Sequence, residues 1–313
     1  MYSYTTIATR QLNSMPLPSS VPSKLNVPVI RAFVALNIIG GAGMLLVLLT
    51  AVMSRNIKRL STWYSFCFSW IALTISYSLL TFAGQQLRPD PAYSLCFAQA
   101  ALVYSMPPTT ACTTLALLVH ILLSFPDSET DTPVRINLAT TTLLLMGPYT
   151  VFLVIFTGVS LYVSRNPDTL QKPPKGTYCN SMDTAWLRVS AVVVAVVSVA
   201  IIVVQGQLAA RLYTSYRSLG RSSRSFMTII RVAAFTLIGF VTLVISMIFS
   251  VTRADDDDGL AFDMIISFFP LLALLVFGSQ KDIYNVWFSK FHIGSGPEIR
   301  DTVFFGRKPA SDP

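Results

Sequence analysis

Few side chains in this sequence are of the types that perform chemistry, and none is spaced as a catalytic or metal-binding motif. The 313 residues include only two histidines, His120 and His292, and four cysteines. Nucleophilic catalysis and metal sites use short patterns such as HExxH, CxxC or GxSxG, and the sequence contains none of them. We therefore expect no catalytic residues, no metal and no cofactor. His120 is expected to be either an interfacial residue or a hydrogen-bonded core residue. A role as a switch is the less favoured alternative.

Seven long apolar segments position these few polar groups. The chain is 53% hydrophobic and only 12% charged, whereas a soluble domain has about 25% charged residues. Each segment approaches or exceeds the roughly 20 residues that an α-helix needs to cross a bilayer. The sequence predicts an all-α membrane protein with a seven-transmembrane helix bundle, whose segments are residues 29–53, 63–84, 95–125, 135–160, 186–213, 228–251 and 260–278.

The positive charges indicate how the bundle is oriented. Because seven is odd, the two ends of the sequence lie on opposite sides of the membrane. The loops and tail that share a side with the C-terminus hold the larger share of the 23 lysines and arginines, and such loops usually face the cytoplasm. The sequence predicts an N-out, C-in orientation. The net charge of +8 is then explained by contact with anionic lipids and acidic partners, and no nucleic-acid-binding signature is present.

The regions outside the bundle are short. Residues 1–28 are rich in Ser, Thr and Pro and are expected to form a disordered extracellular tail. Residues 29–279 form the bundle. Residues 280–291 place Ile283, Trp287 and Phe291 on one face, which predicts an amphipathic juxtamembrane helix. Residues 292–313 are expected to be a flexible cytoplasmic tail.

Two of the cysteines are expected to form a disulfide. Cys96 lies at the outer end of the third segment, and Cys179 lies in the loop between the fourth and fifth segments, on the same side. Both would face the oxidising compartment, where a disulfide persists. The alternative is two unpaired thiols near the interface. Cys67 and Cys112 lie within segments and are expected to be free packing residues.

Prolines interrupt three of the predicted segments. A proline removes a backbone donor and clashes with the preceding turn, so each is expected to kink its helix. The threonines that follow the double proline, from Thr109 to Thr114, are expected to satisfy the freed carbonyls. The alternatives are static packing kinks and a movable bundle. The predicted kink sites are Pro107, Pro108, Pro148 and Pro270.

The outer halves of the segments contain a candidate ligand pocket. Its predicted residues are Gln99, Tyr104, Trp186 and Asp263. An ionisable group within a membrane segment is a functional candidate by default. Asp263 is expected to pair with Arg188 or with a cationic ligand, and the alternative is a solvated carboxylate near the interface.

The cytoplasmic end offers a candidate partner surface. The fifth segment is expected to continue as a helix through Tyr216 and to lead into a loop rich in arginine and serine. Arginine side chains form bidentate pairs with carboxylates on a partner. The alternative is that these arginines only set the topology. The predicted contact residues are Tyr216, Arg217, Arg221 and Arg224.

Three stretches resemble the orphan seven-transmembrane receptors of mushroom-forming fungi (basidiomycetes), a family that is like the G-protein-coupled receptors. They are LSTWYSFCFSW before and within the second segment, LCFAQAALVYSMPPTTACTTLALLVH in the third, and FFPLLALLVFGSQKDIYNVW across the seventh. The Asp-Arg-Tyr and Asn-Pro-x-x-Tyr motifs of rhodopsin-like receptors are missing, so the activation switches of those receptors do not carry over.

The resemblance implies a receptor in the plasma membrane. Such a protein would sense an extracellular or membrane-borne ligand and signal to a heterotrimeric G protein. The alternative function is a seven-span transporter or lipid-handling protein that does not couple to a G protein. Membrane lipids, an unidentified ligand and a G protein are therefore the expected partners.

Overall fold

The computed structural model describes residues 27–54, 59–124, 137–173, 177–219, 237, 258–279, 283 and 286. Most of these residues are helical. The elements are α1 (Val27–Met53), α2 (Ser61–Phe82), α3 (Tyr93–Ser124), α4 (Leu138–Arg165), the 3₁₀ turn η1 (Pro167–Thr169), β1 (Leu170–Gln171), β2 (Asn180–Ser181), α5 (Ala185–Leu219) and α7 (Asp258–Gly278).

Among the described helices, α1 to α5 are each long and apolar enough to cross a membrane. Helix α7 adds a shorter apolar stretch, Asp263–Gly278. The chain therefore has the architecture of a helical, multi-pass membrane protein, as predicted. The predicted sixth segment, 228–251, lies outside the described residues apart from Leu237. The count of seven spans and the N-out orientation stay predictions.

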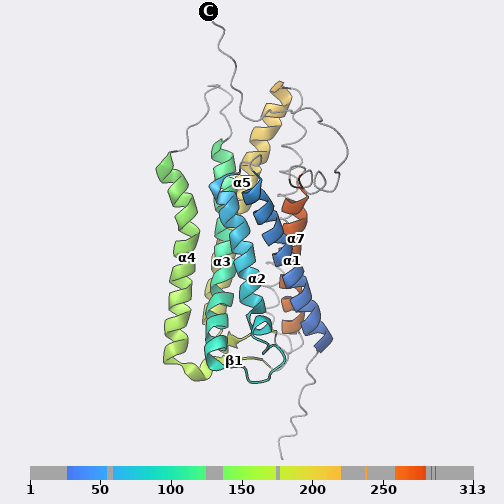
Figure 1. Ribbon diagram of the computed structural model, residues 1–313. Helices are drawn as coiled ribbons and strands as arrows, with labels where there is room; N and C mark the ends of the chain where they lie inside the picture. The colour runs from blue at the N-terminus through green and yellow to red at the C-terminus, as the bar shows by residue number, and fades with distance from the viewer. Residues whose placement is uncertain are drawn as a thin grey trace, which may run out of the picture.

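The helices stand side by side, with α3 at the centre of the described bundle (Figure 1). Helix α3 packs against α2, α4 and α5, while α1 packs against α2 and α7. Helices α2 and α3 are largely buried, whereas the described parts of α4 and α5 leave most of their apolar surface exposed. Exposed side chains such as Leu153 and Val196 fit contact with lipid, because lipid tails are as apolar as they are.

Small residues let α1 approach its two neighbours closely. A Cβ atom on Gly40 would lie 2.6 Å from backbone atoms of Pro270 and Leu271 in α7. A Cβ atom on Gly41 would lie 2.4 Å from the Thr74 side chain in α2. Glycine therefore sets the distance at which α1 packs against both helices, as small residues do in membrane proteins.

The predicted helix bounds are close to those observed, and the largest difference is in α4. Its predicted range of 135–160 becomes Leu138–Arg165. The Asn137 side chain accepts a hydrogen bond from the backbone N–H of Ala139 and so begins the helix. The predicted segment ends at residue 160, where polar residues begin to interrupt the apolar run. Backbone hydrogen bonding continues through these polar residues to Arg165, so the observed helix is longer at this end. Helix α5 continues past Tyr216 to Leu219, which confirms the predicted extension.

The four predicted kink prolines all lie inside helices that continue on both sides of them. The expected role of the threonines after Pro107 and Pro108 is wrong. Prolines at these positions free the carbonyls of residues 103 and 104, four residues earlier. The Thr109 and Thr110 hydroxyls instead donate to the carbonyls of Ser105 and Met106, at 2.7 and 2.8 Å. This is the ordinary bond from a helical threonine to the preceding turn.

The predicted tails lie almost wholly outside the described residues, although α1 begins at Val27, within the range assigned to the first tail. Only two residues of the predicted amphipathic helix, 280–291, are described. Ile283 and Val286 are both helical, and Ile283 is fully buried in the core.

Candidate functional site at the disulfide end of the bundle

The predicted disulfide is present. Cys96 in the first turn of α3 is bonded to Cys179, whose Cα atom lies 5.2 Å from that of Cys96. Both residues are buried. Cys67 and Cys112 are free, as predicted. The bridge joins positions 83 residues apart, so it fixes the loop between α4 and α5 to the end of α3.

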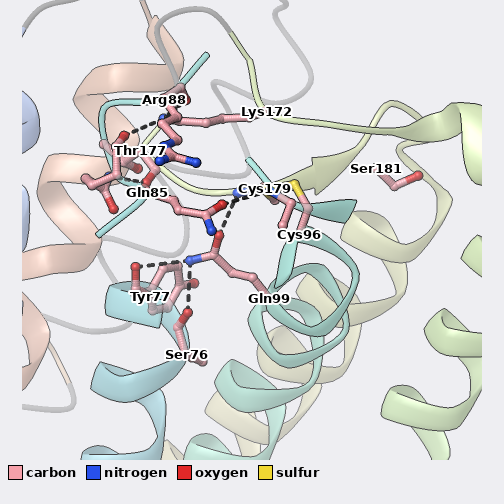
Figure 2. Close-up of a disulfide and its surroundings, with 12 residues drawn as sticks. Ser76, Tyr77, Gln85, Arg88, Cys96, Gln99, Lys172, Thr177, Cys179 and Ser181 are labelled. Carbon is pink, nitrogen blue, oxygen red and sulfur yellow. Dashed lines mark hydrogen bonds between the residues drawn. A yellow bond between two sulfur atoms is a disulfide. The ribbon is translucent and has the colours of Figure 1, made fainter. Parts of the chain in front are cut away.

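Residues 177–181, which we call the Cys179 segment, lie across one end of the bundle (Figures 1 and 2). Antiparallel pairing of Gln171 with Asn180 and of Leu170 with Ser181 ties this segment to the chain that follows α4. Thr177 and Cys179 are fully buried and Ser181 is almost so. The segment is therefore an internal part of the structure.

Gln99 holds the middle of the Cys179 segment. Its Oε1 atom accepts a hydrogen bond of 2.9 Å from the backbone N–H of Cys179. Its Nε2 atom donates to the carbonyls of Ser76 and Tyr77 in α2, at 3.1 and 3.3 Å. Figure 2 shows the Gln99 side chain reaching from α3 between these partners. This fully buried amide therefore links α3, α2 and the loop.

Tyr104 holds the end of the segment. Its hydroxyl accepts a hydrogen bond of 3.1 Å from the Ser181 N–H and lies 3.4 Å from the Ser181 carbonyl, to which it donates. Tyr104 is 5% exposed. Two of the four predicted pocket residues are thus engaged by backbone groups of the same short segment.

Asp263 holds the beginning of the segment. Its Oδ2 atom accepts a hydrogen bond of 2.6 Å from the Thr177 hydroxyl, and the Tyr178 hydroxyl also hydrogen-bonds to this carboxylate. Asp263 is 7% exposed, so the alternative of a solvated carboxylate is wrong. The expected pairing with Arg188 is also wrong, because Arg188 is exposed on α5 and the carboxylate is bound by hydroxyls of the loop.

Two further side chains reinforce the segment from outside. The Gln86 side chain donates a hydrogen bond of 2.7 Å to the Thr177 carbonyl. The Lys172 ammonium donates to the carbonyls of Gln86 and Arg88. Burial lowers the pKa of Lys172, although these carbonyls partly replace the water that the ammonium loses.

Trp186 packs against an apolar cluster that contains Tyr104 of α3 and Ile155, Val159 and Val163 of α4, whereas Gln99 and Asp263 do not belong to that cluster. Trp186 lies on α4, where a Cβ atom on Gly158 would lie 2.4 Å from the indole ring. Its ring centroid is 6.4 Å from that of Tyr162. Just before it, Asp183 accepts hydrogen bonds from the Tyr162 hydroxyl and the Ala185 N–H, and these bonds lower the pKa of Asp183. Trp186 therefore helps to attach the start of α5 to α4.

Two other predictions fall at the opposite end of the bundle. His120 is buried, and its Nδ1 atom lies 3.1 Å from the Thr62 hydroxyl, which confirms a hydrogen-bonded core histidine. Tyr216 and Arg217 belong to the last turns of α5, but their side chains lie outside the described structure, as do Arg221 and Arg224 entirely. The partner surface stays a prediction.

Four residues of this site were not predicted from the sequence. These are Gln86, Thr177, Tyr178 and Ser181. One signal could have found three of them: they flank Cys179, so a disulfide to α3 necessarily brings them to the bundle end. The chemistry of the site is therefore a set of polar side chains from α2, α3 and α7 that converge on one segment of the same chain.

Comparisons with known proteins do not place the chain in a family. No protein-family model matches it, and no curated protein is significantly similar to it.

Proposed function

We propose that this chain is a seven-span receptor of the G-protein-coupled type, located in the plasma membrane with its N-terminus outside. The observation that carries the proposal is the Cys96–Cys179 disulfide. It attaches the loop after the fourth described helix to the start of the third, and that loop contacts α2, α3 and α7 together. The disulfide was expected from the placement of both cysteines on one side of the membrane, and the family resemblance was based in part on these two cysteines.

The proposed mechanism is a shift between two arrangements of the bundle. The Cys179 segment joins three helices at one end through Gln99, Tyr104 and Asp263. A ligand that favours one set of these contacts over another changes the relative free energies of the two arrangements, and only this difference in affinity drives a shift. The cytoplasmic end, with the α5 extension and residues 217–224, would then engage a heterotrimeric G protein.

Nucleotide exchange on a Gα subunit tests this function. The full chain is purified, reconstituted in lipid nanodiscs and mixed with GDP-loaded Gα subunits of each major class. A minor active state is typically populated at about 0.1–10% without ligand, so a molar excess of receptor is expected to accelerate exchange on at least one class. The matched variant replaces Arg217, Arg221 and Arg224 by lysine, which keeps the charge but removes the planar guanidinium.

The lysine variant is expected to lower the exchange rate while its expression stays normal. A control variant with Arg165 and Arg188 replaced by lysine, at the disulfide end, is expected to match the parent protein. If folded protein with an intact disulfide accelerates exchange on no Gα class, the receptor function is contradicted and transport or lipid handling becomes the better hypothesis.

A further inference from the structure

Among the residues that the structure describes, the buried carboxylate of Asp263 is held by neutral groups. Its described hydrogen-bond partners are the Thr177 hydroxyl, at 2.6 Å, the Tyr178 hydroxyl and a backbone group of Thr177. Lys172, a cation of the same loop, donates instead to carbonyls of Gln86 and Arg88. A buried carboxylate is costly unless a cation or several hydrogen bonds compensate it. These hydrogen bonds satisfy the oxygens of the Asp263 carboxylate, but the described residues place no positive charge on it, so a cation in their place would neutralise the charge as well.

The Tyr178 ring, whose hydroxyl bonds to Asp263, belongs to a group of three aromatic rings. Phe33 from α1, Tyr77 from α2 and Tyr178 from the Cys179 segment form a mutual cluster, with ring centroids 5.2 to 6.4 Å apart. Phe33 and Tyr77 are almost fully buried. The Tyr178 hydroxyl connects this group of rings to the Asp263 carboxylate. The cluster thus combines one carboxylate with three rings, contributed by three helices and a loop.

We propose that this cluster is a binding site for an organic cation, a substituted ammonium group carried on a small apolar molecule. Aromatic faces attract such cations, and rings that enclose a quaternary ammonium are a recurring recognition device. A carboxylate supplies the neutralising charge and a strong, charge-assisted contact. A divalent metal ion suits the cluster poorly, because Mg²⁺ and Ca²⁺ take six or more oxygen ligands and the rings offer few.

The Thr177 and Tyr178 hydroxyls occupy the place that the ammonium group would take. They precede Cys179, which the disulfide holds to α3. Binding therefore needs only a local shift of these two residues about Cys179, opposed by the hydrogen bond from Gln86 to the Thr177 carbonyl. The segment acts as an internal competitor, so removal of the Thr177 hydroxyl should strengthen cation binding.

The inference rests on the proposed function for its signalling consequence. Asp263 lies on α7, while the rings of Phe33 and Tyr77 lie on α1 and α2. A cation held between them favours one spacing of α7 against α1 and α2. Further along α7, Pro270 packs directly on Gly40 of α1. A displacement of α7 at Asp263 would therefore also alter this tightly packed contact deeper in the bundle.

Choline is a suitable probe, with 3,3-dimethyl-1-butanol as its uncharged isostere. Thermal unfolding of the full chain in nanodiscs is followed at rising concentrations of each compound. Choline is expected to raise the unfolding temperature in a saturable manner, because a ligand that binds only the folded state stabilises it, and the alcohol is expected to have no such effect. Asp263→Asn should lower choline affinity by about tenfold or more, because it removes the negative charge that attracts the quaternary ammonium.

Asn at position 263 retains an oxygen that accepts the Thr177 hydrogen bond, so the loop keeps its anchor. Tyr77→Leu removes a ring while leaving the carboxylate, and should also weaken binding. Thr177→Val should strengthen it. Asp168→Asn, an exposed carboxylate at the same end, is the matched control and should bind choline like the parent protein.

The proposal would be overturned if choline stabilised the parent protein and Asp263→Asn equally. It would also be overturned if the uncharged alcohol stabilised the parent protein as much as choline does, or if neither compound stabilised it. Nucleotide exchange on Gα, measured on the same preparations, separates this inference from the proposed function. Choline binding without exchange supports the site and contradicts the receptor function. Exchange without choline binding supports the receptor function and contradicts the site.

Discussion

The Thr177 hydroxyl donates a hydrogen bond of 2.6 Å to the Asp263 carboxylate, which connects the loop after α4 to α7. Thr177 lies in the fully buried part of the Cys179 segment, and Asp263 is 7% exposed. Through this contact the segment reaches α7, the last helix in the order of elements. Together with Gln99 and Tyr104 it holds α2, α3 and α7 in one arrangement at this end.

Replacement of Gln99 by leucine is expected to be among the most destabilising changes at this end of the bundle. Leucine fills similar volume but leaves the Cys179 N–H and the Ser76 and Tyr77 carbonyls without their side-chain partner. An unsatisfied buried polar group costs about 1–3 kcal/mol, so we expect a loss of at least that size. Thermal unfolding in detergent measures it. Tyr104→Phe, which removes only a hydroxyl, should cost less, and an equal or smaller loss for Gln99→Leu would argue against this account.

Removal of the disulfide should loosen the Cys179 segment without abolishing the bundle. Loss of a native bridge costs about 2–5 kcal/mol in small secreted domains, and we expect a smaller loss here because the helices are already held by the membrane. A Cys96→Ser, Cys179→Ser double variant should unfold at a lower temperature than Cys112→Ala, its control. Mass spectrometry of unreduced peptides should recover the Cys96–Cys179 link, and free alkylation of Cys96 in native protein would contradict it.

The elements of this fold could be predicted from sequence because long apolar runs leave a membrane helix no alternative. The disulfide could be predicted too, since topology places Cys96 and Cys179 on one side. The partners of Gln99, Tyr104 and Asp263 could not. They depend on the path of the loop, which no local pattern encodes.

The place of Trp186 could not be predicted for a different reason. Helix α5 is apolar on all sides through its membrane segment, so its sequence carries no periodic polar face to show which side meets the bundle. Trp186 was expected to line the outer pocket; it packs on Gly158 of α4, against the apolar cluster that contains Tyr104. A glycine opposite a tryptophan is a packing signal, but it is visible only when both helices are in place.

The close contact between α1 and α7 gives a test of the packing. In Gly40→Ala the new Cβ atom would meet the backbone of Pro270 and Leu271 at 2.6 Å, and backbone cannot move aside cheaply. Overpacking of this kind costs about 1–3 kcal/mol. In the control, Gly206→Ala in α5, no neighbouring atom lies within 4 Å of the new Cβ, and alanine favours helix by up to about 1 kcal/mol. Thermal unfolding should separate the two variants clearly, and equal stability would show that α1 and α7 do not pack as described.

The predicted orientation is the premise of the receptor function, and protease access to intact cells tests it. One variant carries a protease site within residues 217–224, and another carries the same site within residues 1–28. The excess of lysine and arginine on the C-terminal side leads us to expect cleavage only in residues 1–28 of intact cells, and cleavage at both positions after permeabilisation. The disulfide gives the same expectation, because Cys96 and Cys179 lie at the end of the bundle where α1 begins (Figure 1), and a bridge persists on the oxidising side. Cleavage within 217–224 on intact cells, with residues 1–28 protected, would reverse the orientation and with it remove the basis for contact with a cytoplasmic G protein.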